Sequence, residues 1–117
     1  MLRHALVAVL SLAVLVLPVA DAPRAAEPRV VEIVARRFQF TPNVVTIGKD
    51  EAVVLRVRSE DVTHGFFQRE LGINTTIEPG KVTEVALTPH GPGRYSIICH
   101  HFCGAGHGNM KMTVVVE

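Results

Sequence analysis

The chain has 117 residues, which is room for one small domain. Its 12 Lys and Arg residues nearly balance its 11 Asp and Glu residues, so the formal net charge is +1. There is no basic patch and no run of like charge, and this excludes nucleic-acid binding of the usual electrostatic kind.

The first part of the chain does not resemble a domain. A short basic start, residues 1–4, precedes an almost unbroken apolar run over residues 5–20, and small residues with a proline follow up to residue 26. This layout is typical of a secretory signal, and the apolar run falls short of the ~20 residues that a membrane-spanning helix needs. We therefore expect residues 1–26 to be a signal peptide or an N-terminal anchor with its linker. The domain, residues 27–117, is then periplasmic or on the extracytoplasmic face of the membrane.

Residues 27–117 have the pattern of short strands separated by turns, and no window has a helical period with caps. Runs rich in β-branched residues predict strands at 30–35, 44–47, 53–58, 82–87, 95–98 and 111–117. Seven or eight short strands at regular spacing indicate an all-β sandwich. Such a sandwich holds the loops at its two ends on a rigid frame, which suits a functional site.

The residues with the most distinctive chemistry lie between the last two predicted strands. Cys99, Cys103, His107 and Met110 follow one another within twelve residues, in a stretch that three glycines interrupt. Glycine allows the backbone conformations that a tightly folded loop needs. A sandwich can also bring the earlier loop that carries His64 beside this one.

These residue types predict a copper site. Thiolate and thioether are soft ligands, and His64, Cys103, His107 and Met110 alone form the two-histidine, one-cysteine set with a weak methionine that is typical of blue copper. Zinc gains little from a methionine and the chain has no zinc-ribbon cysteine pair, while an iron–sulfur cluster would lack thiolates. Cys99 is one ligand too many for a mononuclear blue site. Two cysteines separated by three residues can bridge a pair of copper ions, so a dinuclear electron-transfer centre is our first hypothesis.

Other interpretations stay open at this point. In an exported protein, two cysteines form a disulfide by default. A copper chaperone that delivers metal to an oxidase or a reductase would use similar ligands in an exchangeable site. A mononuclear blue-copper electron carrier would leave Cys99 idle. A catalytic thiol enzyme is disfavoured, since the cysteines lack the usual two-residue spacing.

Several neighbouring residues match no ligand position. We expect Met112 in the core, His90 in a solvated turn and His100 on an exposed rim. Glu60 and Asp61 are expected in a solvated turn that could help to orient the His64 loop. Four aromatic residues are expected to belong to the core or to shield the site: Phe38, Phe40, Phe66 and Phe67.

Residues 59–66 resemble the first ligand segment of cytochrome c oxidase subunit II, and the Cys-x₃-Cys-x₃-His-x₂-Met run of residues 99–110 resembles the dinuclear copper A signature of that family. Residues 74–80 and 91–95 resemble its intervening strands, so the similarity runs from about residue 38 to the C-terminus. The resemblance implies a cupredoxin-like Greek-key β-sandwich. It also implies electron transfer with two copper ions per chain.

The resemblance further implies a set of six metal ligands: His64, Cys99, His101, Cys103, His107 and Met110. The two histidines would bind one copper each and the two cysteines would bridge them. The methionine and the backbone carbonyl of His101 would be weak axial ligands. The implied partner is a redox protein such as a c-type cytochrome or an oxidase subunit.

Three departures from the family pattern shape what we expect. His101 stands where many members carry a Glu whose side chain serves a second metal at a subunit interface, so the resemblance does not extend to that function. The chain contains no Trp, whereas the family uses tryptophan near the copper to receive electrons from cytochrome c. The usual pair of N-terminal membrane helices is missing, and at most one short anchor precedes the domain. We therefore expect a free-standing relative of subunit II, or an electron-input module, that is not an enzyme by itself, because protein ligands fill every metal position.

Overall fold

The computed structural model describes residues 4–20 and 27–117. Residues 4–20 form neither helix nor strand. Within the two described ranges, no helix is both long enough and apolar enough to cross a membrane. The expected signal or anchor, residues 1–26, falls partly outside the described residues, at 1–3 and 21–26.

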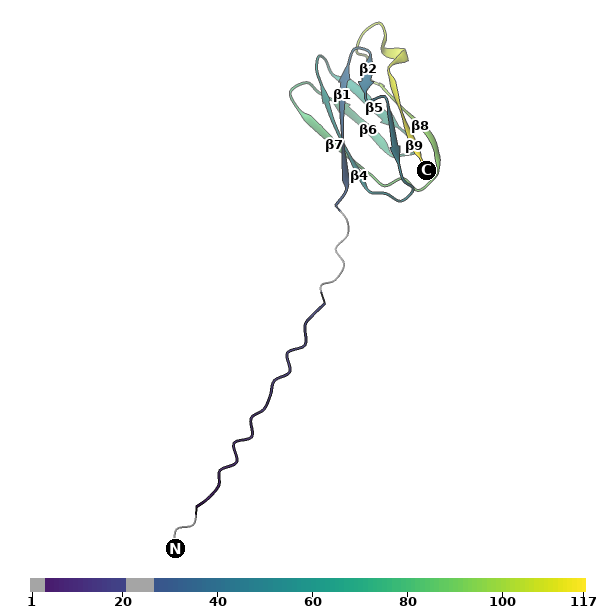
Figure 1. The fold of residues 1–117 in the computed structure, drawn as a ribbon. Coiled ribbons are helices and arrows are strands. Elements are labelled where there is room, and N and C mark those ends of the chain that lie inside the picture. Colours follow the sequence, from purple (N-terminus) through teal and green to yellow (C-terminus); the bar gives the residue numbers. More distant parts are fainter. Residues whose placement is uncertain (1–3, 21–26) are drawn as a thin grey trace.

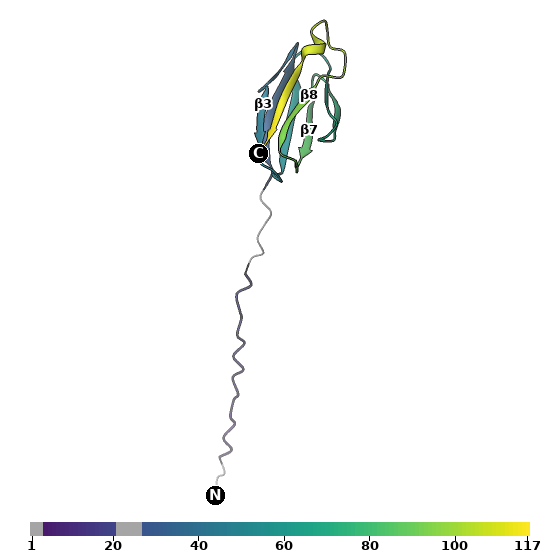
Figure 2. The same ribbon diagram turned by 90° about the vertical axis from the view of Figure 1, so that its right-hand side faces the viewer.

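In the described part of the chain, nine strands form two sheets that pack face to face (Figures 1 and 2). The four-stranded sheet has the order β2-β1-β4-β7 and consists of β1 (Arg29–Arg36), β2 (Gln39–Thr41), β4 (Val53–Ser59) and β7 (Val82–Leu87). The five-stranded sheet has the order β3-β9-β8-β5-β6 and consists of β3 (Val44–Ile47), β5 (His64–Gln68), β6 (Ile73–Ile77), β8 (Gly93–Ile98) and β9 (Lys111–Val116). β1 with β4 and β3 with β9 pair in parallel, and the other named strand pairs are antiparallel.

The predicted all-β sandwich is confirmed, with nine strands rather than seven or eight. Residues 44–47 and 82–87 form strands as predicted. The sequence pattern did not predict β2, β5 or β6. β2 has only three residues and pairs with the end of β1. A three-residue strand is too short to show an alternating pattern, and its neighbour across the hairpin defines it instead.

The core lies between the two sheets, because alternate residues of each strand point inward. In β4, Val53, Leu55 and Val57 are buried while the residues between them are partly exposed. Phe40 and Phe66 come from opposite sheets and meet edge to face with ring centroids 5.5 Å apart. Burial of each such side chain contributes about 1.5–3 kcal/mol. Met112 is also buried, as expected for a core residue of β9.

One end of the sandwich carries the predicted ligands. At this end β5 begins, β8 passes through a long loop into β9, and the turn between β1 and β2 lies beside that loop (Figure 1). The loop contains a short 3₁₀ turn, η1 (His107–Asn109). The frame therefore places segments that are far apart in the sequence against one another.

Candidate metal centre

His64 is the first residue of β5 and its side chain is fully buried, with 0% of its surface exposed. Its Nε2 lies 2.7 Å from Oδ1 of Asp61, and a carboxylate accepts, so Nε2 carries the proton and donates. Within the described part of the chain, the other ring nitrogen, Nδ1, is buried without a hydrogen-bond partner. A buried acceptor without a partner is costly unless it binds a ligand. A carboxylate on the opposite nitrogen is the usual way to fix a metal-binding histidine.

Cys99 and Cys103 lie next to this imidazole. Each is only 3% exposed, and their Sγ atoms are 3.4 Å apart. One ligand atom from each of His64, Cys99 and Cys103 falls within 4.8 Å of the others. Both cysteines are free thiols, so the structure contains three converging metal-ligand atoms rather than a disulfide at this place.

The remaining predicted ligands surround the two sulfurs. Nδ1 of His107 lies 4.0 Å and Sδ of Met110 lies 3.8 Å from Sγ of Cys103. The backbone carbonyl oxygen of His101 lies 3.1 Å from Sγ of Cys99. All six residues that the sequence singles out thus meet at one end of the sandwich.

Local backbone contacts fold the ligand loop back on itself. The amide of Cys99 donates to the carbonyl of Met110 at 3.1 Å, which closes the loop at its base. The amide of Met110 donates to the carbonyl of His107 at 3.2 Å. Gly104 has a φ of +139°, a conformation that side-chain-bearing residues rarely adopt. Gly104 therefore has a specific conformational role in the loop.

The two thiols of the site are buried. Burial, together with the neighbouring thiol of Cys99, raises the pKa of Cys103 to about 11, although the guanidinium of Arg37 acts in the opposite direction. In the metal-free site, the thiol of Cys103 consequently keeps its proton at neutral pH. A metal ion that binds this sulfur must displace that proton, so metal binding is coupled to proton release.

Asp61 contacts the site directly, whereas the sequence predicts only a turn residue that could help to orient the His64 loop. Its partial burial would raise its pKa, but hydrogen bonds from the amides of Arg37 and Val62 and from the ring of His64 lower the pKa to about 2. The hydroxyl of Ser59 bonds to the carbonyl of Val62 and accepts from the amide of Asp61, which shapes the turn. Asp61 is thus an ionised, fixed partner of His64 at neutral pH.

The turn between β1 and β2 also reaches the site. Sequence reasoning expects Phe38 in the core or as a shield of the site, but it misses Arg37. Nε of Arg37 donates to the backbone carbonyl of Cys103 at 2.7 Å. The ring of Phe38 lies against two glycines of the ligand loop: a Cβ added at Gly104 would lie 2.8 Å and one at Gly106 2.5 Å from ring atoms. These contacts join residues about 66 positions apart, so no local pattern could have identified them.

The rim of the site is aromatic and polar. Phe102 is 75% exposed, and its ring centroid lies 5.8 Å from that of His107. His100 is exposed, as expected, stacks on Phe67 at 5.3 Å and bonds through Nε2 to the side-chain oxygen of Asn74 at 2.9 Å.

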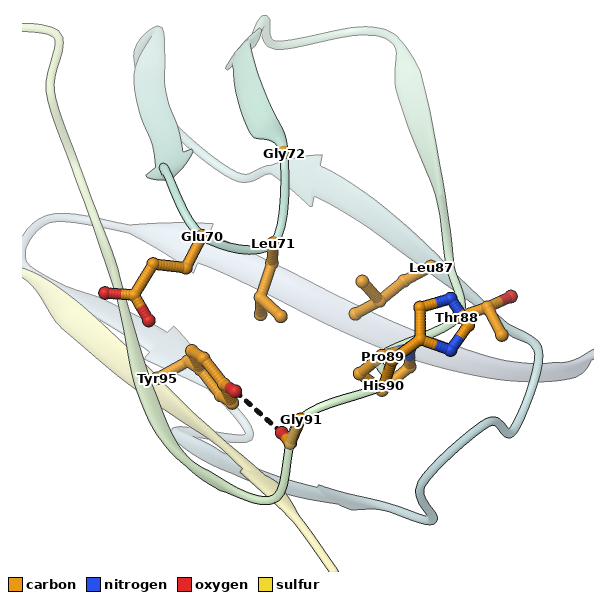
Figure 3. Close-up of a pocket in the computed structure, with 9 residues that line it drawn as sticks. All are labelled: Glu70, Leu71, Gly72, Leu87, Thr88, Pro89, His90, Gly91 and Tyr95. Carbon is orange, nitrogen blue, oxygen red and sulfur yellow. Dashed lines mark hydrogen bonds between the residues drawn. The ribbon is translucent and has the colours of Figure 1, made fainter.

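A pocket of about 410 Å³ lies at the other end of the sandwich, where the turn after β5 faces the connection between β7 and β8 (Figure 3). The hydroxyl of Tyr95 donates to the carbonyl of Gly91 at its wall, at 2.6 Å. His90 lines it, and its side chain is 77% exposed and bonded to Asp50 at 2.6 Å. None of the six predicted ligands lines this pocket.

The residues present fit copper. Two sulfurs from cysteine, one from methionine and two imidazoles form a soft donor set with the composition that copper sites use. The buried, unpartnered Nδ1 of His64 supplies the independent structural sign that a ligand belongs there.

Comparisons with known proteins identify the family of the chain. A family model described as a cupredoxin-like domain matches residues 6–116. Cytochrome c oxidase subunit 2 of Thermus thermophilus is 39% identical over 87 residues, which cover 74% of this chain and 64% of that protein. The chain therefore spans less than two thirds of the length of this curated relative.

Solved structures share the fold. A chain of a heme–copper terminal oxidase dimer matches with a TM-score of 0.69 at 29% identity, covering 76% of this chain and 65% of that one. The periplasmic domain of subunit II of cytochrome oxidase from Bradyrhizobium japonicum has a TM-score of 0.70 at 16% identity, covering 76% and 83%, and at that identity it shows the fold alone. The chain belongs to the family of cupredoxin-like domains and, within it, is similar to subunit 2 of cytochrome c oxidase.

Proposed function

We propose that this chain is an extracytoplasmic electron-transfer protein with a dinuclear copper site of the copper A type. The observation that carries the proposal is the pair of free thiols 3.4 Å apart, flanked by two imidazoles and a thioether. Copper supplies a one-electron redox couple when it is bound there. The similarity to subunit 2 of cytochrome c oxidase supports the same assignment.

The positions of the donor atoms support a role for each ligand. Cys99 and Cys103 would hold the copper pair together, since their sulfurs are adjacent and lie at the centre of the cluster. Nδ1 of His64 would be one imidazole donor, because the other ring nitrogen is bonded to Asp61. His107 would be the second imidazole donor. Met110 and the carbonyl of His101 would be weak donors beside the sulfurs.

The protein frame suits electron transfer rather than turnover of a substrate. The donor groups lie at the start of β5 and on the loop between β8 and β9, and these three strands belong to the five-stranded sheet. Most of the donor groups are buried, so their arrangement changes little when charge is added or removed. Every donor position is contributed by the chain, which leaves no position for a substrate. His107 is the imidazole ligand nearer to solvent, since it is partly exposed whereas His64 is fully buried.

The setting of the proposed function is the outside of the cytoplasmic membrane. Residues 1–26 serve as export signal or anchor, and a redox protein such as a c-type cytochrome or an oxidase subunit is the partner. The balanced charge of the chain gives no basis for a nucleic-acid partner.

Metal analysis and electron paramagnetic resonance test the dinuclear site. We expect about two copper ions per chain and a seven-line hyperfine pattern, because an electron shared equally by two copper nuclei splits that way. Cys99→Ser should hold one copper and give four lines, since the remaining ligands form a blue-copper set. One copper and four lines in the fully loaded, unmodified protein would replace the dinuclear assignment by a mononuclear carrier.

The chaperone alternative makes a different demand on the site. A chaperone must hand over its metal, which needs exposed and exchangeable ligands, whereas four of the donor residues here are 0–3% exposed. Slow loss of copper to an excess of chelator, over hours, is therefore expected of the carrier. Loss within seconds would favour delivery.

A further inference from the structure

Arg37 places a positive charge beside the ligand loop without belonging to it. Its Nε donates to the carbonyl oxygen of Cys103 at 2.7 Å. A guanidinium stays charged at all relevant pH values. Among the described residues, Arg29, Arg56 and Arg58 have carboxylate partners within 4 Å, whereas Arg37 takes part in no ion pair. Its charge is therefore not neutralised by direct pairing.

The turn that carries Arg37 is fixed to both ligand segments. The backbone amide of Arg37 donates to Oδ2 of Asp61 at 2.8 Å, and Asp61 in turn holds His64. The next residue, Phe38, packs against the ligand loop at Gly104 and Gly106. The guanidinium is thus attached at a defined position rather than on a freely moving surface side chain.

The neighbouring Arg36 provides a natural comparison. Its guanidinium is bonded within its own hairpin. When the side-chain amide of Gln39 is oriented with its oxygen toward Arg36, that oxygen accepts a hydrogen bond from Nη2 of Arg36 at 2.7 Å. The two arginines carry the same charge on adjacent residues, and only Arg37 bonds to a ligand residue.

We propose that Arg37 raises the reduction potential of the metal centre, as a positioning residue that acts through Cys103. This inference rests on the proposed copper function. When the site accepts one electron from its redox partner, it gains one negative charge, and a nearby cation stabilises the reduced form more than the oxidised form. The hydrogen bond to the carbonyl of Cys103 adds to this effect, because groups bonded to ligand residues tune a metal's potential.

The test compares midpoint potentials of the copper-loaded full chain by spectroelectrochemical titration. Arg37→Met removes the charge and the donor but keeps an apolar stem of similar length, so its potential should fall clearly below that of the unmodified protein. Arg37→Lys keeps the charge and should lie closer to the unmodified protein than Arg37→Met does. Arg36→Met removes the same charge one residue away and should leave the potential nearly unchanged. Thermal unfolding of each metal-free variant shows whether it folds.

The outcomes separate this inference from the proposed function. An unchanged potential in Arg37→Met, an equal fall in Arg36→Met, or an equal fall in Arg37→Lys would each overturn the role of the Arg37 charge. If Arg37→Met does not fold, Arg37→Gln, which is neutral but can still donate, takes its place against Arg37→Lys. If the unmodified protein binds a single copper, the dinuclear function fails while the comparison of potentials still decides the role of Arg37. If the protein binds no copper, both fail.

Discussion

The imidazole of His64 depends on a single carboxylate. Asp61 fixes which ring nitrogen carries the proton and leaves Nδ1 directed to the site as an acceptor. Asp61 is partly buried, but hydrogen bonds from two backbone amides and from the His64 ring lower the pKa of its carboxyl to about 2. The metal affinity of the site should therefore depend on Asp61, although Asp61 bonds only to Nε2 of His64 and not to the nitrogen that faces the site.

We expect Asp61→Asn to weaken copper binding about 10- to 100-fold, the usual effect of removing a group bonded to a metal-binding histidine. The amide keeps the shape of the side chain but loses its charge and no longer fixes the His64 tautomer. Competition titrations with a chelator of known affinity measure the change. Glu60→Gln is the matched control, because Glu60 is the adjacent acid and its Oε1 pairs with Nη2 of Arg58 at 3.6 Å rather than with His64. Equal affinities in the two variants would contradict the role of Asp61.

At this scale the sequence predicts ligand types and little of what surrounds them. Cysteine, histidine and methionine at regular spacing identify Cys99, Cys103 and Met110 because their chemistry is rare and local. Asp61 could be suspected, since it precedes His64 by three residues. Arg37 could not, because its contact with Cys103 exists only after β1 and the ligand loop have come together.

At the scale of elements, the ligand loop and the β1–β2 turn form one packed unit. The ring of Phe38 occupies the space in which side chains at Gly104 and Gly106 would otherwise stand. Gly108, in the same loop, has no atom within 4 Å of a built Cβ. The three glycines of the loop are therefore not equivalent.

Gly106→Ala should destabilise the metal-free protein by about 1–3 kcal/mol, the usual cost of forcing extra volume into a packed site. Gly108→Ala, the matched control, should change the free energy of unfolding by no more than about 0.5 kcal/mol. Chemical denaturation of both variants gives the two values. The packing of Phe38 on the loop would be refuted by equal stabilities.

The sequence predicts a strand where β-branched residues, or an alternation of apolar and polar residues, extend over at least four positions between turns. β3 and β7 have the predicted bounds, since β-branched residues and flanking turns define them. The short β2 escapes prediction because its three residues form a strand only by pairing with β1. The same hairpin carries Arg37 and Phe38, so the element hardest to predict is also the one that supports the site.

At the scale of the whole molecule, the sandwich is complete without the N-terminal segment. β1 begins at Arg29, and residues 4–20 are exposed throughout and belong to no sheet. The two-sheet architecture follows from the number and spacing of the strands. The pairing order does not, because the parallel partners β1–β4 and β3–β9 are distant in sequence.

A protein that consists of residues 27–117 should therefore fold and load copper as the full chain does. Exposed terminal segments contribute little to stability when their backbone makes no structural hydrogen bonds. We expect the two proteins to have the same midpoint of thermal unfolding within error and the same copper content. A clearly lower midpoint for residues 27–117 would show that the preceding segment is part of the domain.

The base of the ligand loop has a consequence for how such proteins diversify. Ile98 and Lys111 lie opposite each other in the β8–β9 ladder, so the two ends of the loop are held at a fixed spacing whatever the loop contains. The entropic cost of closing a loop rises only slowly with its length. Insertions, deletions and exchanges of ligands between these two residues can thus alter the number and kind of bound metals while the sheets stay intact. In this architecture, substitutions in one loop can change the bound metal without a change in the β-sandwich.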